Sequence, residues 1–353
     1  MVSFFGEIKM NNLKKLNCGK LPDDDLSKIL ERYTNSVSER ILLGPKLGED
    51  AAIIDMSSAE TAKNNCLAVA VDPIMVNISN APYFAVAINV NDIVTRGAIP
   101  KWASASVFFP AGSTLEDVDK FFGQLYDAIK PHGISIVTGH TEVTSLVKNP
   151  GIVLTMLGEV DKDKIITTAG AKEGDSLVLT GGAGIEGTAI LAADLRESLN
   201  GKVDEPTLDR AREFIYHPGI CIASAAYIAW KHSPNSLHDP TEGGVRKGIE
   251  ELAIASGNGV YIDYAKIPIR EETREICAVT GDDPLGIFGS GALLISIGKD
   301  KVEGLLRDYS DAGILAAEIG QVTAKEKGRV LLYQGKEIPL LASYTDGLID
   351  RLN

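Results

Sequence analysis

Four aspartates that lie far apart in the sequence have the chemistry needed to hold a divalent metal ion: Asp50, Asp72, Asp92 and Asp239. Asp50 lies in a turn before an apolar strand and Asp72 ends the next one, where acids are usually only solvated. Asp92 is less ordinary, because Asn91 and Asp92 interrupt an apolar helical stretch where they would be costly to bury unpaired. We therefore expect them to face a polar site. Asp92 could share Mg²⁺ there with Asp50 or Asp72, since Mg²⁺ prefers carboxylate oxygens and water.

A second candidate segment, Thr138-Gly139-His140-Thr141-Glu142, follows an expected strand over 134–138. One interpretation is a turn that carries a surface histidine. The other is a loop shaped by Gly139 and Thr141 to face a phosphate, in which Glu142 adds a carboxylate directed at a metal ion. The segment taken alone leaves both interpretations open.

A third segment, His238-Asp239-Pro240-Thr241-Glu242-Gly243-Gly244, precedes an expected helix over 245–256. Thr241 or Asp239 could cap that helix, and Gly243 and Gly244 would let backbone N–H groups approach an anion. A glycine inside a helix costs about 1 kcal/mol relative to alanine. Two glycines in the first turn therefore indicate a function rather than a plain helix start.

Residues 182–187, Gly-Ala-Gly-Ile-Glu-Gly, match the glycine pattern of a dinucleotide-binding turn between a strand and a helix. The rest of that unit is missing, because residues 200–206 are a polar stretch where a second strand ending in an acid is required. A phosphate loop of the type GxxxxGK[ST] does not occur either. The acids and glycine-rich turns together indicate a Mg²⁺–nucleotide site of another kind.

The composition is that of a globular protein, with 353 residues, 44% apolar and 24% charged, and a net charge of −13. An excess of acids disfavours binding to a nucleic-acid backbone, which requires Lys and Arg to neutralise phosphates. Four cysteines without paired spacing disfavour a disulfide or zinc scaffold. No apolar run approaches the ~18 residues of a membrane span. We expect a soluble, cytoplasmic protein that binds neither nucleic acid nor membrane.

The length predicts two domains at ~150 residues per domain. We expect an N-terminal arm over 1–40, an α/β domain over 41–165 and a second one over 166–353, with the charged stretch 161–174 at the boundary. The expected strands are 66–71, 102–109, 134–138, 152–158, 177–180, 260–262, 292–297, 315–320 and 329–333. The expected helices are 26–33, 83–94, 115–129, 188–195, 208–230 with a break at 217–219, 245–256 and 301–309.

The order of six motifs resembles the superfamily of aminoimidazole ribonucleotide (AIR) synthase, which includes the hydrogenase-maturation protein HypE, selenophosphate synthetase and thiamine-monophosphate kinase. The motifs are GEDAAII (48–54), VDP (71–73), NVNDIVTRGAIP (89–100), TGHTE (138–142), HDPTEGG (238–244) and GSGALL (289–294). The resemblance covers about residues 40–330. HDPTEGG and GSGALL look most like the HypE branch.

This resemblance implies a two-domain α/β (α+β) fold, in which the mixed sheet of the N-terminal domain forms a barrel at a homodimer interface. It also implies ATP in a groove near that interface, with phosphates bridged by Mg²⁺ to acidic residues. The implied metal ligands are Asp50, Asp72, Asp92 and Glu142. The implied nucleotide-binding residues are Lys20, Asp50, Asp72, Asn91, Gly139, His140, Thr141, Gly243 and Gly244, and the implied catalytic residues are Asp92 and Asp239.

Three departures from the family pattern bear on function. HypE-like proteins end in a cysteine that carries the carbamoyl group, whereas this chain ends in Asn353, so we expect no such chemistry on its own tail. His140 stands where HypE-like chains have an acid, so either Glu142 compensates or Mg²⁺ binds more weakly. The glycine-rich N-terminal segment is reduced to residues 17–20, where Lys20 could reach phosphates and Cys18 is a weak candidate nucleophile.

We therefore predict a Mg²⁺-dependent, ATP-binding homodimer of the HypE/AIR-synthase type that uses phosphate to activate an oxygen of a small-molecule acceptor. Positioning and charge neutralisation would be the protein's contribution. Two alternatives stay open: a small-molecule kinase like thiamine-monophosphate kinase, and a non-catalytic, nucleotide-binding partner in the maturation of another protein. The missing terminal cysteine and His140 favour the last of these.

Overall fold

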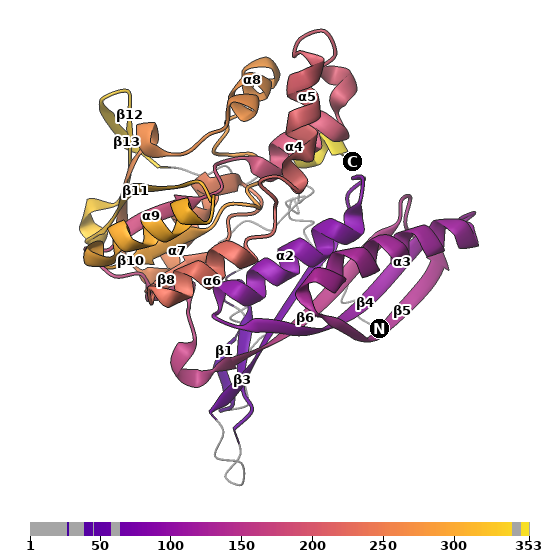
Figure 1. The fold of residues 1–353 in the computed structure, drawn as a ribbon, viewed down its shortest axis with the longest axis horizontal. Coiled ribbons are helices and arrows are strands. Elements are labelled where there is room, and N and C mark those ends of the chain that lie inside the picture. The colour runs from indigo at the N-terminus through magenta and orange to yellow at the C-terminus, as the bar shows by residue number, and fades with distance from the viewer. Residues whose placement is uncertain (1–26, 28–38, 45, 58–63, 341–346, 353) are drawn as a thin grey trace, which may run out of the picture.

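The computed structural model describes residues 27, 39–44, 46–57, 64–340 and 347–352, which form two sheets with helices packed against them (Figure 1). The first sheet has six strands in the order β1-β2-β3-β6-β4-β5. These strands are β1 (Ile41–Leu43), β2 (Ala52–Asp55), β3 (Asn65–Ile74), β6 (Gly151–Asp161), β4 (Ile99–Pro110) and β5 (Ser135–Thr144). Neighbours are antiparallel except β4 and β5, which are parallel, so the sheet is mixed.

Two helices, α2 (Ala81–Thr95) and α3 (Leu115–Ile129), cover one face of the first sheet. Along β3 and β6 the residues largely alternate between buried and partly exposed, as expected when one face is covered. Helix α3 is amphipathic and begins with a capping box, in which the side chains of Thr114 and Asp117 accept from each other's backbone N–H. Helix α2 differs, because every residue except Tyr83 is buried.

The second sheet has seven strands in the order β13-β12-β9-β11-β7-β10-β8. These are β13 (Lys336–Pro339), β12 (Arg329–Tyr333), β9 (Gly259–Asp263), β11 (Ala316–Thr323), β7 (Ser176–Thr180), β10 (Leu294–Ile297) and β8 (Ser236–His238). Only β9 and β12 pair in parallel. The chain is thus a mixed α+β fold with one mixed sheet in each half.

Helices surround this second sheet. They are α4 (Ile185–Ala193), α5 (Glu205–Arg212), α6 (Ala223–Lys231), α7 (Gly244–Ser256), α8 (Glu271–Thr280), α9 (Val302–Asp311) and α10 (Gly347–Leu352). Every residue of β7 and β10 is buried. Alternate residues of β7 belong to different hydrophobic clusters, Val178 to one and Leu179 to the other. The second sheet is therefore covered on both faces, unlike the first.

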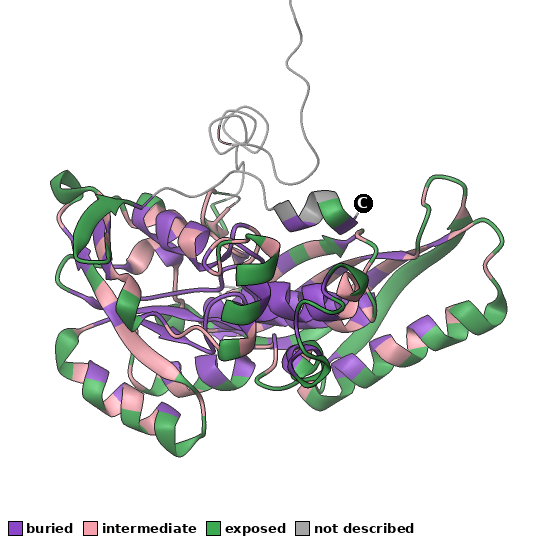
Figure 2. Cartoon of the chain, turned by 90° about the horizontal axis from the view of Figure 1, so that it is seen from above, coloured by how far each residue is buried: buried purple, intermediate pink, exposed green. Residues whose placement is uncertain are grey.

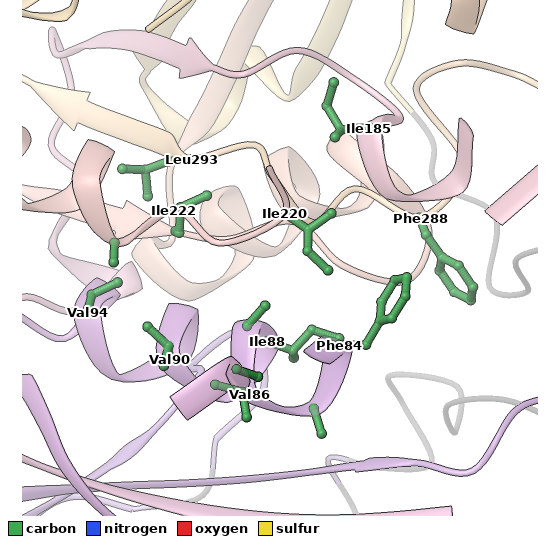
Figure 3. Close-up of a cluster of buried hydrophobic side chains, with 14 of the residues drawn as sticks. Phe84, Val86, Ile88, Val90, Val94, Ile185, Ile220, Ile222, Phe288 and Leu293 are labelled. Atoms are coloured by element: carbon green, nitrogen blue, oxygen red, sulfur yellow. The ribbon is translucent and has the colours of Figure 1, made fainter. Parts of the chain in front are cut away.

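The larger hydrophobic cluster is continuous between the two halves of the chain. Figure 3 shows Val90 and Val94 of α2 facing Ile222 and Leu293 of the second half. Polar bonds reinforce this contact, because Trp230 Nε1 donates to the carbonyl oxygen of Val94 at 3.2 Å. In Figure 2 the buried residues gather in the middle of the molecule, while exposed ones cover the end formed by α3 and β5. Helix α2 is therefore the centre of the fold.

Most of the elements expected from the sequence are confirmed within a few residues, and the helix over 115–129 is confirmed at both ends. The expected helix over 26–33 lies outside the described residues apart from Ser27. The sequence patterns missed β8 and α8, which are short or weakly periodic. Among the described residues, no helix is both long and apolar enough to cross a membrane.

The expected helical region over 208–230 with a break at 217–219 is confirmed, because α5 and α6 are separated by a 3₁₀ turn and further non-helical residues over 216–222. One expectation about an element is wrong. The segment 138–142 is not a loop, because β5 runs on to Thr144 and pairs with β4 along its whole length. Gly139 makes this pairing possible, since a Cβ there would lie 2.5 Å from the carbonyl oxygen of Ala105.

Candidate functional site

Arg96, which directly follows α2, joins the two halves of the site. Its side chain is completely buried and forms ion pairs with Glu49 and Asp50, the latter at 2.7 Å. The guanidinium also donates to Thr168 Oγ1 at 3.0 Å and to the carbonyl oxygen of Leu237 at 2.9 Å. Leu237 belongs to β8 of the second sheet, whereas Glu49 and Asp50 precede β2 of the first. Arg96 therefore fixes the two sheets relative to each other where Asp50 lies.

His238, at the end of β8, is a second buried cation beside Asp50. Its Nδ1 lies 2.8 Å from Asp50 Oδ1, and its Nε2 lies 2.9 Å from Oε2 of Glu251 in α7. Burial lowers the pKa of His238, but the charges of Asp50 and Glu251 outweigh burial and hold the pKa well above its usual value. Burial raises the pKa of Asp50, yet the charges of His238 and Arg96 outweigh it and lower the pKa. Asp50 is thus an ionised carboxylate between two buried cations.

Asp92 and Asp239 are buried acids beside this arrangement. Neither oxygen of the Asp239 carboxylate has a hydrogen-bond partner in the described part of the chain. Burial, and then the charges of Asp72, Asp239 and Asp50, raise the pKa of Asp92 well above its usual range. Burial and the charge of Asp50 do the same for Asp239, although His238 and Arg96 act against them. The structure therefore brings together the four aspartates that the sequence singled out.

The chemistry of this group of acids fits a divalent cation. Asp50, His238 and Asp239 each offer one possible ligand atom, and these three atoms lie within 4.8 Å of one another. Both nitrogens of His238 face carboxylates, so its imidazolium balances charge there rather than acting as a ligand. The unpartnered oxygens of Asp239, with the mutually repelling Asp92 and Asp72, are hard oxygen donors of the kind that Mg²⁺ prefers.

The two asparagines of α2 have different partners. The Asn89 side-chain oxygen accepts from the backbone N–H of Asp72 at 3.2 Å, and its nitrogen lies 3.4 Å from the carbonyl oxygen of Asp72. Asn91, expected at the nucleotide, instead donates to the carbonyl oxygen of Ile220 and accepts from the N–H of Ile222, both at 2.9 Å. Asn89 thus holds Asp72 in place, and Asn91 attaches α2 to the second half of the chain.

The start of α7 is not capped by a side chain. The capping residue is Gly243, with φ +79°, and no side-chain hydrogen bond is formed, so the expectation that Thr241 or Asp239 caps this helix is wrong. The Thr241 carbonyl oxygen accepts from the N–H of Gly244 and of Gly289. A Cβ on Gly244 would lie 2.5 Å from two backbone oxygens of the loop 285–287. Close packing of that loop therefore already requires glycine at 244.

The residues predicted on the segment 138–142 lie on the outer edge strand β5, away from the aspartates (Figure 1). Gly139, His140, Thr141 and Glu142 are all exposed there. His140 Nε2 and Glu142 Oε2 form an exposed pair at 3.3 Å. Within one copy of the chain, Glu142 is therefore not part of the described group formed by Asp50, His238 and Asp239.

Two further candidates, Lys20 as a nucleotide-binding residue and Cys18 as a nucleophile, lie outside the described residues. Cys221 and Cys277 are described, and burial raises the pKa of their thiols to about 11 and about 12. At neutral pH such thiols stay protonated and are poor nucleophiles.

Sequence reasoning missed the basic half of the site. Arg96 and His238 lie inside the motifs NVNDIVTRGAIP and HDPTEGG, in which other residues, chiefly the acids, predicted a site. Glu251 lies in α7, and nothing in the sequence around it indicated a role in the site. The clue that was available for Arg96 is its position directly after an apolar helical stretch, where a buried cation needs anionic partners.

Comparison with known proteins agrees with this fold and site. Residues 48–160 match the family model of the AIR synthase related protein, N-terminal domain. Residues 172–332 match the model of the AIR synthase related protein, C-terminal domain. The chain therefore belongs to the AIR synthase-related family.

Within that family, the chain is similar to hydrogenase expression and formation proteins. It is 32% identical to a putative hydrogenase expression/formation protein of Methanocaldococcus jannaschii over 70% of this chain and 71% of the relative. It is 31% identical to carbamoyl dehydratase HypE of Cupriavidus necator, over 68% of this chain and 66% of that protein. A crystal structure of hydrogenase maturation protein HypE in complex with ATP has the same fold, with a TM-score of 0.66, 24% identity, and coverage of 87% and 92% of the two chains.

Proposed function

We propose that this protein is an ATP-dependent enzyme of the HypE/AIR-synthase type, which binds Mg²⁺–ATP at the four aspartates and activates an oxygen of a small acceptor with phosphate. The observation that carries the proposal is the convergence of Asp50, Asp72, Asp92 and Asp239 from both halves of the chain around unpartnered carboxylate oxygens. ATP as the nucleotide follows from similarity to the HypE structure with bound ATP.

Asp72, Asp92 and Asp239 would hold Mg²⁺, which supplies charge neutralisation for the transferred phosphate. Two observations support these ligands over a purely structural role. Burial, and then the charges of neighbouring aspartates, raise the pKa values of Asp92 and Asp239, so a bound cation would stabilise their ionised forms. Asp50 is already neutralised by Arg96 and His238, so its role is to hold those cations and the geometry of the site.

The proposal includes a cytoplasmic homodimer whose domains span 41–165 and 166–353. The uncovered face and outer edge of the first sheet carry exposed apolar side chains at Val71, Trp102, Val137 and Val143. Exposed apolar patches mark surfaces that contact other molecules, and a second copy of the chain would bury these residues in a symmetric dimer. His140 and Glu142 would then lie at the subunit interface rather than in the aspartate cluster of their own chain.

The similarity to carbamoyl dehydratase HypE leads us to propose a dehydration or condensation on an amide or carboxylate oxygen, within a protein-maturation pathway. The kinase and the non-catalytic partner remain alternatives. Product analysis separates the three: a dehydrated or condensed acceptor, a phosphorylated acceptor, or no ADP released at all.

The first test is stabilisation by nucleotide. With Mg²⁺–ATP at about 100 times its dissociation constant, the wild type should gain about 2.7 kcal/mol in unfolding free energy. Asp92→Asn should lose that gain, because it removes a metal ligand without changing size. Asp119→Asn on the exposed face of α3 is the matched control and should keep it. A wild type that melts at the same temperature with and without saturating Mg²⁺–ATP would refute the proposal.

A further inference from the structure

The side-chain amide of Asn89 in α2 pairs with the backbone of Asp72 near the end of β3. Its oxygen accepts from the N–H of Asp72 at 3.2 Å, and its nitrogen donates to the carbonyl oxygen of Asp72 at 3.4 Å and to that of Ala85 at 2.9 Å. Asn89 itself is completely buried. Because an amide offers a donor and an acceptor in one group, it can hold both backbone groups of a single residue. Asn89 therefore fixes the orientation of Asp72 as well as its position.

The strands of the first sheet hold Asp72 differently on their two sides. On one side, Asp72 is paired with Leu154 of β6. On the other side, β2 begins at Ala52 and pairs with β3 only as far as Val69, so β2 stops short of Asp72. Helix α2 therefore supplies, through Asn89, a backbone contact to β3 beyond the point where β2 ends.

The same helix carries Asp92, three residues after Asn89. Residues three apart lie on one face of a helix, and the carboxyl of Asp92 shares a hydrogen bond with that of Asp72. Helix α2 thus contacts Asp72 twice, at its backbone through Asn89 and at its carboxylate through Asp92. Ile88 and Val90, on either side of Asn89, are buried in the larger hydrophobic cluster (Figure 3). The spacing of the two carboxylates is therefore set by a tightly packed helix.

A fixed spacing of ligands affects which divalent cation binds. Mg²⁺ demands nearly ideal octahedral geometry with oxygens at ~2.0–2.1 Å, whereas Ca²⁺ accepts oxygens at ~2.3–2.6 Å in flexible arrangements. Residues that orient metal ligands without binding the metal contribute about 10- to 100-fold to its affinity. Two carboxylates held at one spacing therefore favour Mg²⁺, and freedom of one of them to move reduces that preference.

We propose that Asn89 is a positioning residue, which fixes the carboxylate of Asp72 relative to that of Asp92 and thereby determines the preference of the site for Mg²⁺ over Ca²⁺. This assignment rests on the proposed function, because it takes Asp72 and Asp92 as ligands of the cation. It adds ion selectivity, and gives that role to a residue whose own polar side-chain atoms are bonded to the protein backbone.

The test measures ion binding to the full-length protein. Mn²⁺ is titrated and followed by the EPR signal of the free ion, and MgCl₂ or CaCl₂ then displaces it at pH 7 and fixed ionic strength. Asn89→Leu removes both bonds to Asp72 with little change of size, and should weaken Mg²⁺ binding at least about tenfold. Ca²⁺ binding should weaken less than about threefold, because Ca²⁺ tolerates varied geometry. An unchanged ratio of the two affinities in a folded Asn89→Leu protein would overturn the proposal.

A second variant and a matched control separate positioning from a general loss of stability. Asn89→Ser also removes the amide, and since serine is smaller than asparagine it cannot overpack the core, so it should lower the Mg²⁺ to Ca²⁺ ratio even if Asn89→Leu does not fold. Asn258→Leu makes the same chemical change elsewhere, where Asn258 Nδ2 donates to the carbonyl oxygen of Ala171 at 2.9 Å. It should lower the melting temperature and leave the ratio unchanged. An equal change of the ratio in Asn258→Leu would overturn the assignment to Asn89.

The same titrations, repeated with a non-hydrolysable ATP analogue, let the two proposals fail separately. Wild type that binds none of the three ions, with or without the analogue, would refute the proposed function and this assignment together. Wild type that prefers Mg²⁺ while both Asn89 variants keep that preference would refute the assignment alone and leave the proposed function standing. Wild type that binds Ca²⁺ as tightly as Mg²⁺ would also refute the assignment alone.

Discussion

Two of the histidine–carboxylate pairs among the described residues lie in opposite surroundings. His238 and Asp50 lie 2.8 Å apart, and their side chains are 4% and 9% exposed. His140 and Glu142 lie 3.3 Å apart on the edge strand β5, where their side chains are 64% and 51% exposed. Burial raises the energetic cost of an unpaired charge, so the first pair is fixed by its surroundings and the second is solvated. In sequence, both looked like a histidine near an acid in a short polar motif.

The carboxylate of the buried pair is surrounded by buried cations. Asp50 is held by Arg96 and His238, which together contact both sheets. The exposed pair on β5 has no such support from elements around it. Substitutions in the buried group should therefore have much larger effects on stability than those on β5.

Arg96→Met should have the largest effect on stability. The change leaves Glu49 and Asp50 as buried carboxylates without their common counter-charge, and loss of one partner of a buried ion pair costs about 3–5 kcal/mol. The unfolding free energy from urea denaturation measures this directly. A loss below about 1 kcal/mol would contradict the view that this network is a main link between the two sheets.

Asp239→Asn should raise the stability of the nucleotide-free protein and weaken its binding of Mg²⁺–ATP. In the absence of nucleotide, the variant should melt at a higher temperature than wild type, because it removes one of several repelling buried carboxylates. The apparent affinity for Mg²⁺–ATP should fall at least about tenfold, since one charge-assisted contact to the cation is lost. Thermal melting with a nucleotide titration gives both values. A lower melting temperature without nucleotide would contradict the assignment of Asp239 as an uncompensated charge.

His238→Gln should have an intermediate effect. Glutamine can still donate a hydrogen bond but has no charge, so Asp50 and Glu251 lose part of their compensation. We expect the unfolding free energy to fall by about 1–3 kcal/mol, as for a lost hydrogen bond to a charged group. Chemical denaturation at pH 7 is the measurement. An unchanged value would show that the imidazole is not a structural cation.

His140→Gln is the matched substitution in the exposed pair and should have the smallest effect. Exposed ion pairs contribute about 0–1 kcal/mol, so the denaturation curve should nearly overlay that of wild type. Because His140→Gln and His238→Gln make the same chemical change, the difference between their unfolding free energies reports on burial alone. Equal losses for the two variants would show that burial does not distinguish the two pairs.

Much of the fold and the acidic half of the site could be predicted from the sequence. Periodic apolar residues located α3 correctly, because its two faces differ clearly in polarity. Helix α2 was found through its apolar composition, although it is buried on all sides and has no polar face. The convergence of Asp50, Asp72, Asp92 and Asp239 followed from their positions at the ends of apolar segments and from the family resemblance.

The partners of these residues could not be predicted. Arg96 contacts Asp50 and Leu237, which are separated from it by 46 and 141 residues, and no local pattern encodes such contacts. The partners of Asn91, which was expected at the nucleotide, could not be predicted for a similar reason, since nearby polar residues on one helix point to different elements. The segment 138–142 was read as a loop because glycine is common in turns, whereas here it permits close strand pairing.

The burial of α2 also determines how the molecule can open. A helix packed on every side exchanges its amide hydrogens only when its neighbours separate from it. Asn91 and Trp230 tie this helix to the second half of the chain, so the two sheets cannot unfold one after the other without breaking the same contacts. We therefore expect hydrogen exchange at α2 to report on the separation of the two sheets, and the two halves of the chain to unfold as one cooperative unit.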